Sequence, residues 1–258
     1  MIPRILVALA LAACAAPAAA QTAAAPPRVE FLPRAAFHMT AEHLWGEADP
    51  RFRWDTNFGG ELDLIDFAVG RLTFVANYQA ILGEEYQVFD PNQGNYILEG
   101  SLSGRFPHVE LAGVFYHQSR HLGDRPKEVP VDWNMVGVRA IRVFPAGAFH
   151  VETRADVRGV IKQSFIDYTW EFDGRLRADR VVRPGVGVLL AGGVRHLGVD
   201  GSRDRGGQTG FRGEAGVRLE GSAGAVELFV SAERRIDPYP LEFSTATWVT
   251  AGFRLLTR

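Results

Sequence analysis

Two stretches of this chain alternate between apolar and charged side chains, and this period of two constrains the fold more than any other feature. In residues 147–159 and 209–220, every second side chain is apolar or small and most of those between are ionic. The apolar row of the first stretch is Phe149, Val151, Thr153, Ala155 and Val157. Such a pattern predicts β-strands with one apolar and one ionic face. A soluble sandwich turns the ionic face to water, whereas a membrane barrel encloses it in a polar lumen.

Twelve strands of this kind are expected, near residues 36–45, 56–67, 71–82, 95–105, 108–120, 132–143, 147–159, 163–175, 181–195, 209–220, 224–234 and 246–256. The links between them alternate in length, with short links such as 106–107 and 145–147 and long ones such as 121–132 and 196–209. Short turns at one rim and long loops at the other are typical of outer-membrane barrels. The sequence therefore predicts an all-β protein, a single antiparallel up-and-down transmembrane β-barrel with periplasmic turns and extracellular loops. A secreted soluble sandwich stays open as the alternative.

The N-terminus has the layout of a secretory signal peptide. Arg4 precedes an apolar core, and Ala18-Ala19-Ala20 forms a small-residue cleavage site. We expect a signal peptide over 1–20, a disordered N-terminal segment over 21–34 and the barrel over 35–258. A second interpretation stays open, because the residues up to Cys14 also fit a lipoprotein cleavage box. Either way, the expected location is the bacterial outer membrane.

The composition excludes several classes of function. The net charge is −2, so nucleic acid is not an expected partner. After the signal peptide there is no run of about 18 apolar residues, which excludes a transmembrane helix. Cys14 is the only cysteine, so disulfides, a thiol nucleophile and a cysteine-based zinc site are not available to the mature chain.

The stretch FYHQSRHLGD, residues 115–124, holds the candidate catalytic residues. His117 and Ser119 continue the apolar row of the strand near 108–120, so we expect both to face lipid at the extracellular rim. The next strand returns from this rim, and Asn134 begins its apolar row. A serine, a histidine and an asparagine therefore converge on the outside of the barrel. Asn134 can hold the His117 ring while His117 accepts the Ser119 proton, as in a nucleophile, base and orienting-residue triad.

These residues carry a resemblance to two families. The H-x-S at the end of an outward strand, a long loop and then W-N resemble the active site of the outer-membrane phospholipase A family, a twelve-stranded barrel with lipid-facing catalytic residues. The resemblance implies an acyl-ester hydrolase in which Ser119, His117 and Asn134 are catalytic. That family follows its serine with Asn-Gly, whereas this chain has Arg120-His121. The wider stretch is also similar to an uncharacterised family of bacterial outer-membrane proteins with an H-x-S-x-H-L-G-D run.

Calcium is the one candidate cofactor. Asp124, with Glu128 or Asp132, offers hard oxygen ligands near the serine, as the phospholipase resemblance implies. His117 and His121 are about 13 Å apart on an extended strand and do not share a metal there. The expected partners are membrane lipids and the barrel-assembly machinery, with a homodimer left open.

A barrel without enzymatic activity, either a narrow channel or a structural protein, is the competing interpretation. Its functional surface is then the ionic rows, which include Arg212, Glu214, Arg218 and Glu220. The diameter of a barrel grows with its strand number, and the side chains of this barrel can fill its lumen, so conductance does not follow from the fold.

Overall fold

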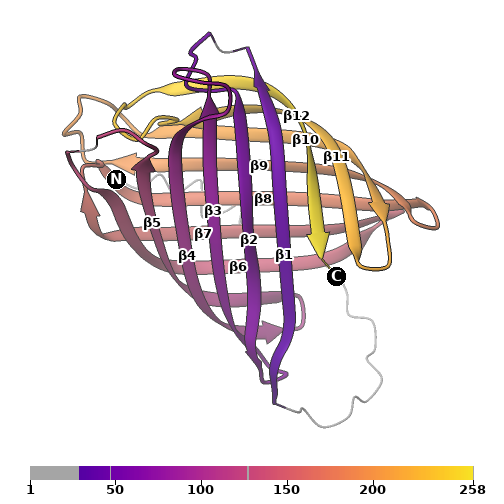
Figure 1. Cartoon of the computed structure of the whole chain (residues 1–258). Coiled ribbons are helices and arrows are strands. Elements are labelled where there is room, and N and C mark those ends of the chain that lie inside the picture. The colour runs from indigo at the N-terminus through magenta and orange to yellow at the C-terminus, as the bar shows by residue number, and fades with distance from the viewer. Residues whose placement is uncertain (1–28, 47, 127, 258) are drawn as a thin grey trace, which may run out of the picture.

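The computed structural model describes residues 29–46, 48–126 and 128–257, which form a closed barrel of twelve antiparallel strands. Each strand pairs with its neighbours in sequence, and β1 pairs with β12, from His38 opposite Leu256 to Trp45 opposite Val249 (Figure 1). The all-β, up-and-down architecture and the number of strands are as predicted. The strands are β1 (Glu30–Trp45), β2 (Trp54–Asp66), β3 (Arg71–Gly83), β4 (Asp90–Phe106), β5 (Val109–Leu122), β6 (Val131–Ala146), β7 (Phe149–Ser164), β8 (Tyr168–Arg183), β9 (Val186–Val199), β10 (Gln208–Glu220), β11 (Gly224–Ile236) and β12 (Thr245–Thr257).

The apolar rows lie on the outside of the barrel. On β5, Leu111 and Phe115 are 45% and 48% exposed, while Val114 and Tyr116 on the opposite face are 4% and 8% exposed. Because successive side chains of a strand point to opposite faces, the exposed row is the outer one and the buried row faces the lumen. β10 follows the same pattern, with Phe211 exposed and Glu214 buried. The sequence pattern therefore gives the orientation of these strands correctly.

The links differ at the two ends of the barrel, as expected. At one end, named here the short-turn rim, only a few residues join β2 to β3, β4 to β5, β6 to β7, β8 to β9 and β10 to β11. At the other end, the long-loop rim, longer loops join β1 to β2, β3 to β4, β5 to β6, β9 to β10 and β11 to β12. The β7–β8 link is the exception at the long-loop rim, because it consists of residues 165–167 alone.

The N-terminal boundary differs from the expectation. β1 begins at Glu30, which is opposite Asp66 of β2, so residues 30–34 belong to the barrel and not to a disordered segment. The ladder shifts register between Phe31 and Arg34 before regular pairing continues. This irregularity interrupts the alternation of side chains by which the strand would be recognised in the sequence. The predicted signal peptide, Cys14 and residues 21–28 lie outside the described residues.

Two predicted strands were placed about five residues too early. The expected ranges 163–175 and 181–195 correspond to β8 at Tyr168–Arg183 and β9 at Val186–Val199. The reason is that β7 continues to Ser164 through a β-bulge: Met135 is opposite Val160, but Asn134 is opposite Lys162, and Ile161 is the extra residue. A bulge shifts the alternation by one position, and in a sequence this resembles the end of a strand.

The lumen holds a dense network of ion pairs. Arg139 of β6 donates two hydrogen bonds of 2.6 Å to Glu99 of β4 and one of 2.8 Å to Asp156 of β7. Arg158 bonds Glu171, which also accepts from Arg195. Buried charges are tolerated only when they are paired and hydrogen-bonded, so these contacts allow ionic strand faces to line the interior.

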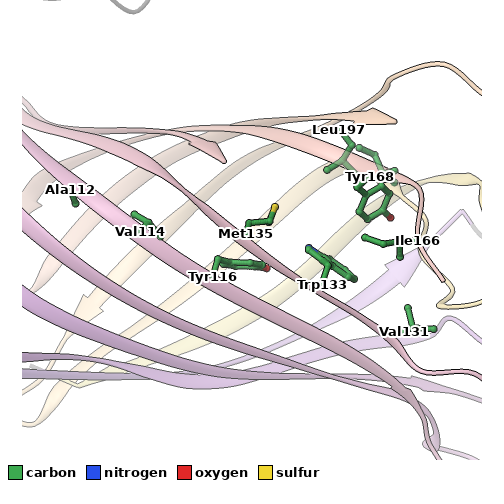
Figure 2. Packing of buried hydrophobic residues seen from close by; sticks show 10 residues of the cluster. Ala112, Val114, Tyr116, Val131, Trp133, Met135, Ile166, Tyr168 and Leu197 are labelled. Atoms are coloured by element: carbon green, nitrogen blue, oxygen red, sulfur yellow. The ribbon is translucent and has the colours of Figure 1, made fainter. Parts of the chain in front are cut away.

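Apolar side chains line the lumen toward the long-loop rim. Tyr116, Met135, Trp133 and Tyr168 follow one another along the inner wall in Figure 2, and the rings of Trp133 and Tyr168 meet edge to face at 5.4 Å. The buried members of this cluster are Ala112, Val114, Tyr116, Val131, Trp133, Met135, Ile166, Tyr168, Leu197 and Ile236. The cluster gives the inner wall of this barrel an apolar region near the long-loop rim.

Candidate functional site

His117 and Asn134 face each other on β5 and β6. The two residues are direct partners in the antiparallel ladder, and His117 Nδ1 lies 2.9 Å from Asn134 Oδ1. An amide oxygen only accepts hydrogen bonds, so this contact requires the ring proton on Nδ1. In the neutral form with that proton, Nε2 carries the free lone pair. The register of neighbouring strands therefore brings together two of the three predicted site residues.

The pair lies on the outer face of the barrel. His117 and Ser119 continue the exposed row of Leu111 and Phe115, and both are half-buried. β5 ends at Leu122, so the row reaches the long-loop rim at this point. This is the face and the height that the strand pattern predicts.

Ser119 lies one step closer to the rim than His117, about 7 Å along the strand. Its direct neighbours are Tyr96 on β4 and Asp132 on β6. Within the described part of the chain, the Ser119 side chain makes no hydrogen bond with His117. A nucleophile and its base are often further apart without substrate than in the reacting complex, so the row brings Ser119 near His117 without forming the bond.

Asp132 is placed differently from the sequence interpretation. The sequence offered it, as an alternative to Glu128, as a calcium ligand at the end of the loop after Ser119, but it lies on β6 directly opposite Ser119. Asp124 is exposed in the loop with a positive φ of 49°. Among the described residues, no three His, Cys, Asp or Glu side chains are arranged to hold a metal. Calcium at Asp124 thus stays a prediction that this geometry does not support.

An aromatic row runs along the outer face next to the candidate site. Phe58, Tyr78 and Tyr96 are direct partners on β2, β3 and β4, with ring centroids 5.1 Å and 4.8 Å apart. Ser119 is the partner of Tyr96 on β5, and His121, one step nearer the rim, meets the Tyr96 ring edge to face at 5.4 Å. His121 therefore packs against an aromatic ring on the side of the site away from Asn134. The sequence analysis missed Tyr96, because only the register of β4 against β5 places it beside Ser119.

Lys162 is a second residue near the site that the sequence analysis did not predict there. The bulge at Ile161 makes Lys162 the partner of Asn134 on the side opposite His117. His117, Asn134 and Lys162 thus form one row across three strands, and Lys162 is exposed. Because this strand was predicted to end at residue 159, Lys162 fell outside the predicted strands and was assigned to neither face of the barrel.

The ionic rows proposed for a non-enzymatic barrel do lie in the lumen. Arg212 pairs with Glu42, Glu214 and Glu233 at 2.9–3.1 Å. Nearer the short-turn rim, Arg218 pairs with Glu227. Arg212 and its three glutamate partners border a cavity of about 840 Å³. The predicted charged interior is therefore present, with its charges engaged in pairs.

The loop between β11 and β12 bonds to the wall of the lumen at the long-loop rim. Buried Arg120 donates hydrogen bonds to the carbonyl oxygens of Asp237 and Pro238 at 2.7 Å and 2.9 Å. Arg205 bonds the Asp237 carboxylate, which also accepts from Tyr168 at 2.6 Å. This loop and the apolar cluster together narrow the lumen at the long-loop rim.

No helix among the described residues is long and apolar enough to cross a membrane. No family model matches the chain, and no curated protein matches its sequence. Neither family resemblance noted in the sequence is therefore confirmed by these comparisons.

The fold does match solved structures. Outer membrane phospholipase A from Escherichia coli is 12% identical, with a TM-score of 0.53 over 88% of this chain and 93% of that chain. An active-site mutant of that enzyme is 11% identical, with a TM-score of 0.52 over 88% of this chain and 91% of that one. The KdgM porin in complex with disordered oligogalacturonate is 8% identical, with a TM-score of 0.47 over 85% of this chain and 98% of that chain. At these identities the likeness concerns the fold alone. The fold, with its exposed apolar outer face, is that of a bacterial outer-membrane β-barrel protein.

Proposed function

We propose that this outer-membrane barrel is an acyl-ester hydrolase that acts on lipids of the outer leaflet. Ser119 is the nucleophile, His117 is the general base and Asn134 orients His117. The observation that carries the proposal is the 2.9 Å contact between His117 Nδ1 and Asn134 Oδ1 on the lipid-facing side, with Ser119 in the same row. A substrate with its ester in the membrane reaches such a site directly from the bilayer.

The reaction begins when Ser119 Oγ attacks the ester carbonyl and His117 Nε2 takes the hydroxyl proton. The tetrahedral intermediate breaks its bond to the alcohol oxygen, and His117 returns the proton to that leaving oxygen. Water then attacks the acyl-serine with His117 again as base, releasing the fatty acid and restoring Ser119. Asn134 Oδ1 accepts from Nδ1 throughout, which keeps Nε2 directed at the reacting atoms.

Calcium does not enter these steps. Asp132 gives one carboxylate opposite Ser119, and the described residues provide no group of three metal-binding side chains. Those residues do not fit a bound cation, so stabilisation of the oxyanion is assigned to no metal here. The assembly machinery, expected from the sequence, stays a prediction, and a homodimer stays open.

The rival is a barrel without enzymatic activity. Its channel form is disfavoured by the apolar cluster around Trp133 and by the β11–β12 loop bonded to Arg120. Its structural form fits the paired charges of the lumen, but it gives no reason for a histidine and an asparagine to bond on the lipid-facing surface. In hydrocarbon a polar pair is expensive, and its placement there favours a role in contact with lipid.

The test is hydrolysis of phospholipid in mixed detergent micelles by purified, folded protein. We expect wild type to release fatty acid and Ser119→Ala to lose this activity. Ser164→Ala is the matched control, because Ser164 is the ladder partner of Asp132 and lies in the same row two strands from Ser119. Equal rates in wild type and Ser119→Ala, or no hydrolysis by either, would overturn the proposal.

A further inference from the structure

Lys162 is the cation nearest to the His117–Asn134 pair along its row. It is the ladder partner of Asn134 on β7, while His117 is the partner of Asn134 on β5. The outward direction of Lys162 depends on the bulge. Val160 packs against the lumen cluster, and in a regular ladder residues 160 and 162 would both face inward, whereas the bulge at Ile161 places Lys162 opposite outward Asn134. Bulges of this kind occur next to active sites, where they redirect a side chain.

The chemistry of Lys162 also sets it apart from the cations of the lumen. The chain has 28 lysine and arginine residues, of which only Lys127 and Lys162 are lysines. The lumen cations described above are arginines, whose planar fork suits paired carboxylates. Lys162 is exposed, and within the described residues it has no ion pair. A lysine on a lipid-facing strand extends its stem along the apolar surface and holds its ammonium at headgroup height.

The spacing of Lys162 from Ser119 suits one class of lipid. The two residues are two strands apart and one row apart, which places their backbones about 12 Å from each other at ordinary strand spacing. The extended four-carbon stem of lysine crosses about half of that gap. In a glycerophospholipid, the short glycerol backbone separates the acyl ester from the phosphate, so both sites can be occupied by one molecule.

We propose that Lys162 binds the lipid phosphate of a glycerophospholipid whose acyl ester lies at Ser119. This inference rests on the proposed function and specifies its substrate class. Lys162 is then a specificity-determining residue: it holds the anionic headgroup and touches no reacting atom. Asp132, opposite Ser119, lies between the two positions, and the Lys162 ammonium offsets the repulsion of its carboxylate toward a phosphate.

The test compares two substrates with the same acyl chains, a phospholipid and a diacylglycerol, in the same micelles. We expect Lys162→Ala to raise the KM for the phospholipid roughly tenfold, with kcat little changed and diacylglycerol hydrolysis unaffected. Lys162→Arg keeps the charge and is expected to restore most of the affinity. Arg234→Ala is the matched control, because it removes an outer-face cation from β11, whose Arg234 is opposite exposed Phe211.

A binding measurement separates the two proposals. Ether-linked phospholipid and dialkylglycerol, which have no ester to cleave, are bound to Ser119→Ala with and without Lys162→Ala and measured by native mass spectrometry. Weaker binding of the phospholipid alone in the double variant supports the inference. An equal loss of binding for both lipids, or no loss for either, overturns it. So does inhibition by inorganic phosphate that is equally strong for hydrolysis of the phospholipid and of the diacylglycerol. If wild type cleaves diacylglycerol through Ser119 and Lys162→Ala does not change phospholipid hydrolysis, the hydrolase proposal stands. The role of Lys162 is then rejected.

Discussion

Arg139 and Glu99 are joined by two parallel hydrogen bonds of 2.6 Å, although β5 lies between their strands. Both side chains are 4% exposed. The link is possible because the barrel wall curves, so that inward side chains of β4 and β6 converge inside the lumen. Arg139 also bonds Asp156, while Glu99 lies within 3.5 Å of Arg154. The pair therefore links three strands, β4, β6 and β7, from the inside.

Removing one partner of this pair should destabilise the barrel strongly. Glu99→Ala leaves the Arg139 charge partly unpaired in the lumen, for which about 3–5 kcal/mol is expected. The measurement is the urea midpoint of unfolding in detergent. Glu220→Ala is the control, because the exposed Glu220 pairs with Arg218 at the short-turn rim and should change stability by less than about 1 kcal/mol. Similar midpoints for the two variants would contradict the assigned role of the Arg139–Glu99 pair.

Asn134 should act on the rate through His117. Asn134→Ala removes the acceptor at Nδ1, so the ring loses its fixed orientation, and kcat for lipid hydrolysis should fall roughly 100-fold. Asn134→Asp retains an acceptor and adds a charge that stabilises the imidazolium. The acidic limb of its pH–rate profile, along which His117 loses a proton and becomes able to act as base, should therefore move to higher pH, and part of the rate should be recovered. A purely structural Asn134 predicts equal loss in both variants and an unchanged profile.

The sequence predicted the fold well because the alternation of side chains within a strand shows which of its faces is apolar. On β5 and β10, one face is apolar and the other ionic, and a closed sheet leaves only the outside and the lumen to receive them. His117 and Asn134 were predicted together for a similar reason. They lie near the ends of two consecutive strands, and the loop between those strands restricts their register.

The features that were not predicted from the sequence depend on register irregularities and on pairing between residues of different strands. The bulge at Ile161 shifts the alternation, so β7 was ended too early and Lys162 was left outside every strand. Asp132 was considered as a loop ligand because it stood at the boundary between the loop 121–132 and the predicted strand 132–143, whereas β6 begins at Val131 and includes it. Tyr96 joins Ser119 only through the β4–β5 ladder, which no local pattern specifies.

The barrel should not conduct ions in its wild-type form. Arg120 and Arg205 hold the β11–β12 loop against the lumen, where the rings of Trp133 and Tyr168 narrow it further. Planar-bilayer recordings of wild type should show no stable single-channel steps. Replacing both arginines by alanine releases the loop, and intermittent currents are then expected. Steady conductance of wild type, unchanged in the double variant, would contradict this assignment and promote the channel interpretation.

A contact between two loops at the long-loop rim should weaken in acid. Burial alone would raise the pKa of Asp49, but its hydrogen bonds and charge attraction to Arg51 outweigh burial and hold the pKa below the ordinary 3.8. Arg51 also donates a 2.6 Å hydrogen bond to Glu242 and stacks 4.2 Å above the Tyr239 ring. Asp49 thus positions the arginine that joins the first loop to the last.

The sign of the pH effect follows from this depressed pKa. The folded state binds the Asp49 proton less readily than the unfolded chain, so the stabilisation is complete above pH 3.8 and is lost as the pH falls through the lower folded value. Because the pair is partly exposed, less than about 1 kcal/mol is at stake. Hydrogen exchange of residues 237–244, corrected for the intrinsic pH dependence, should be flat from pH 7 to 5 and rise below 3.8. Asp49→Asn should show the faster exchange already at pH 7. If its exchange there matches that of wild type, Asp49 does not hold these loops together.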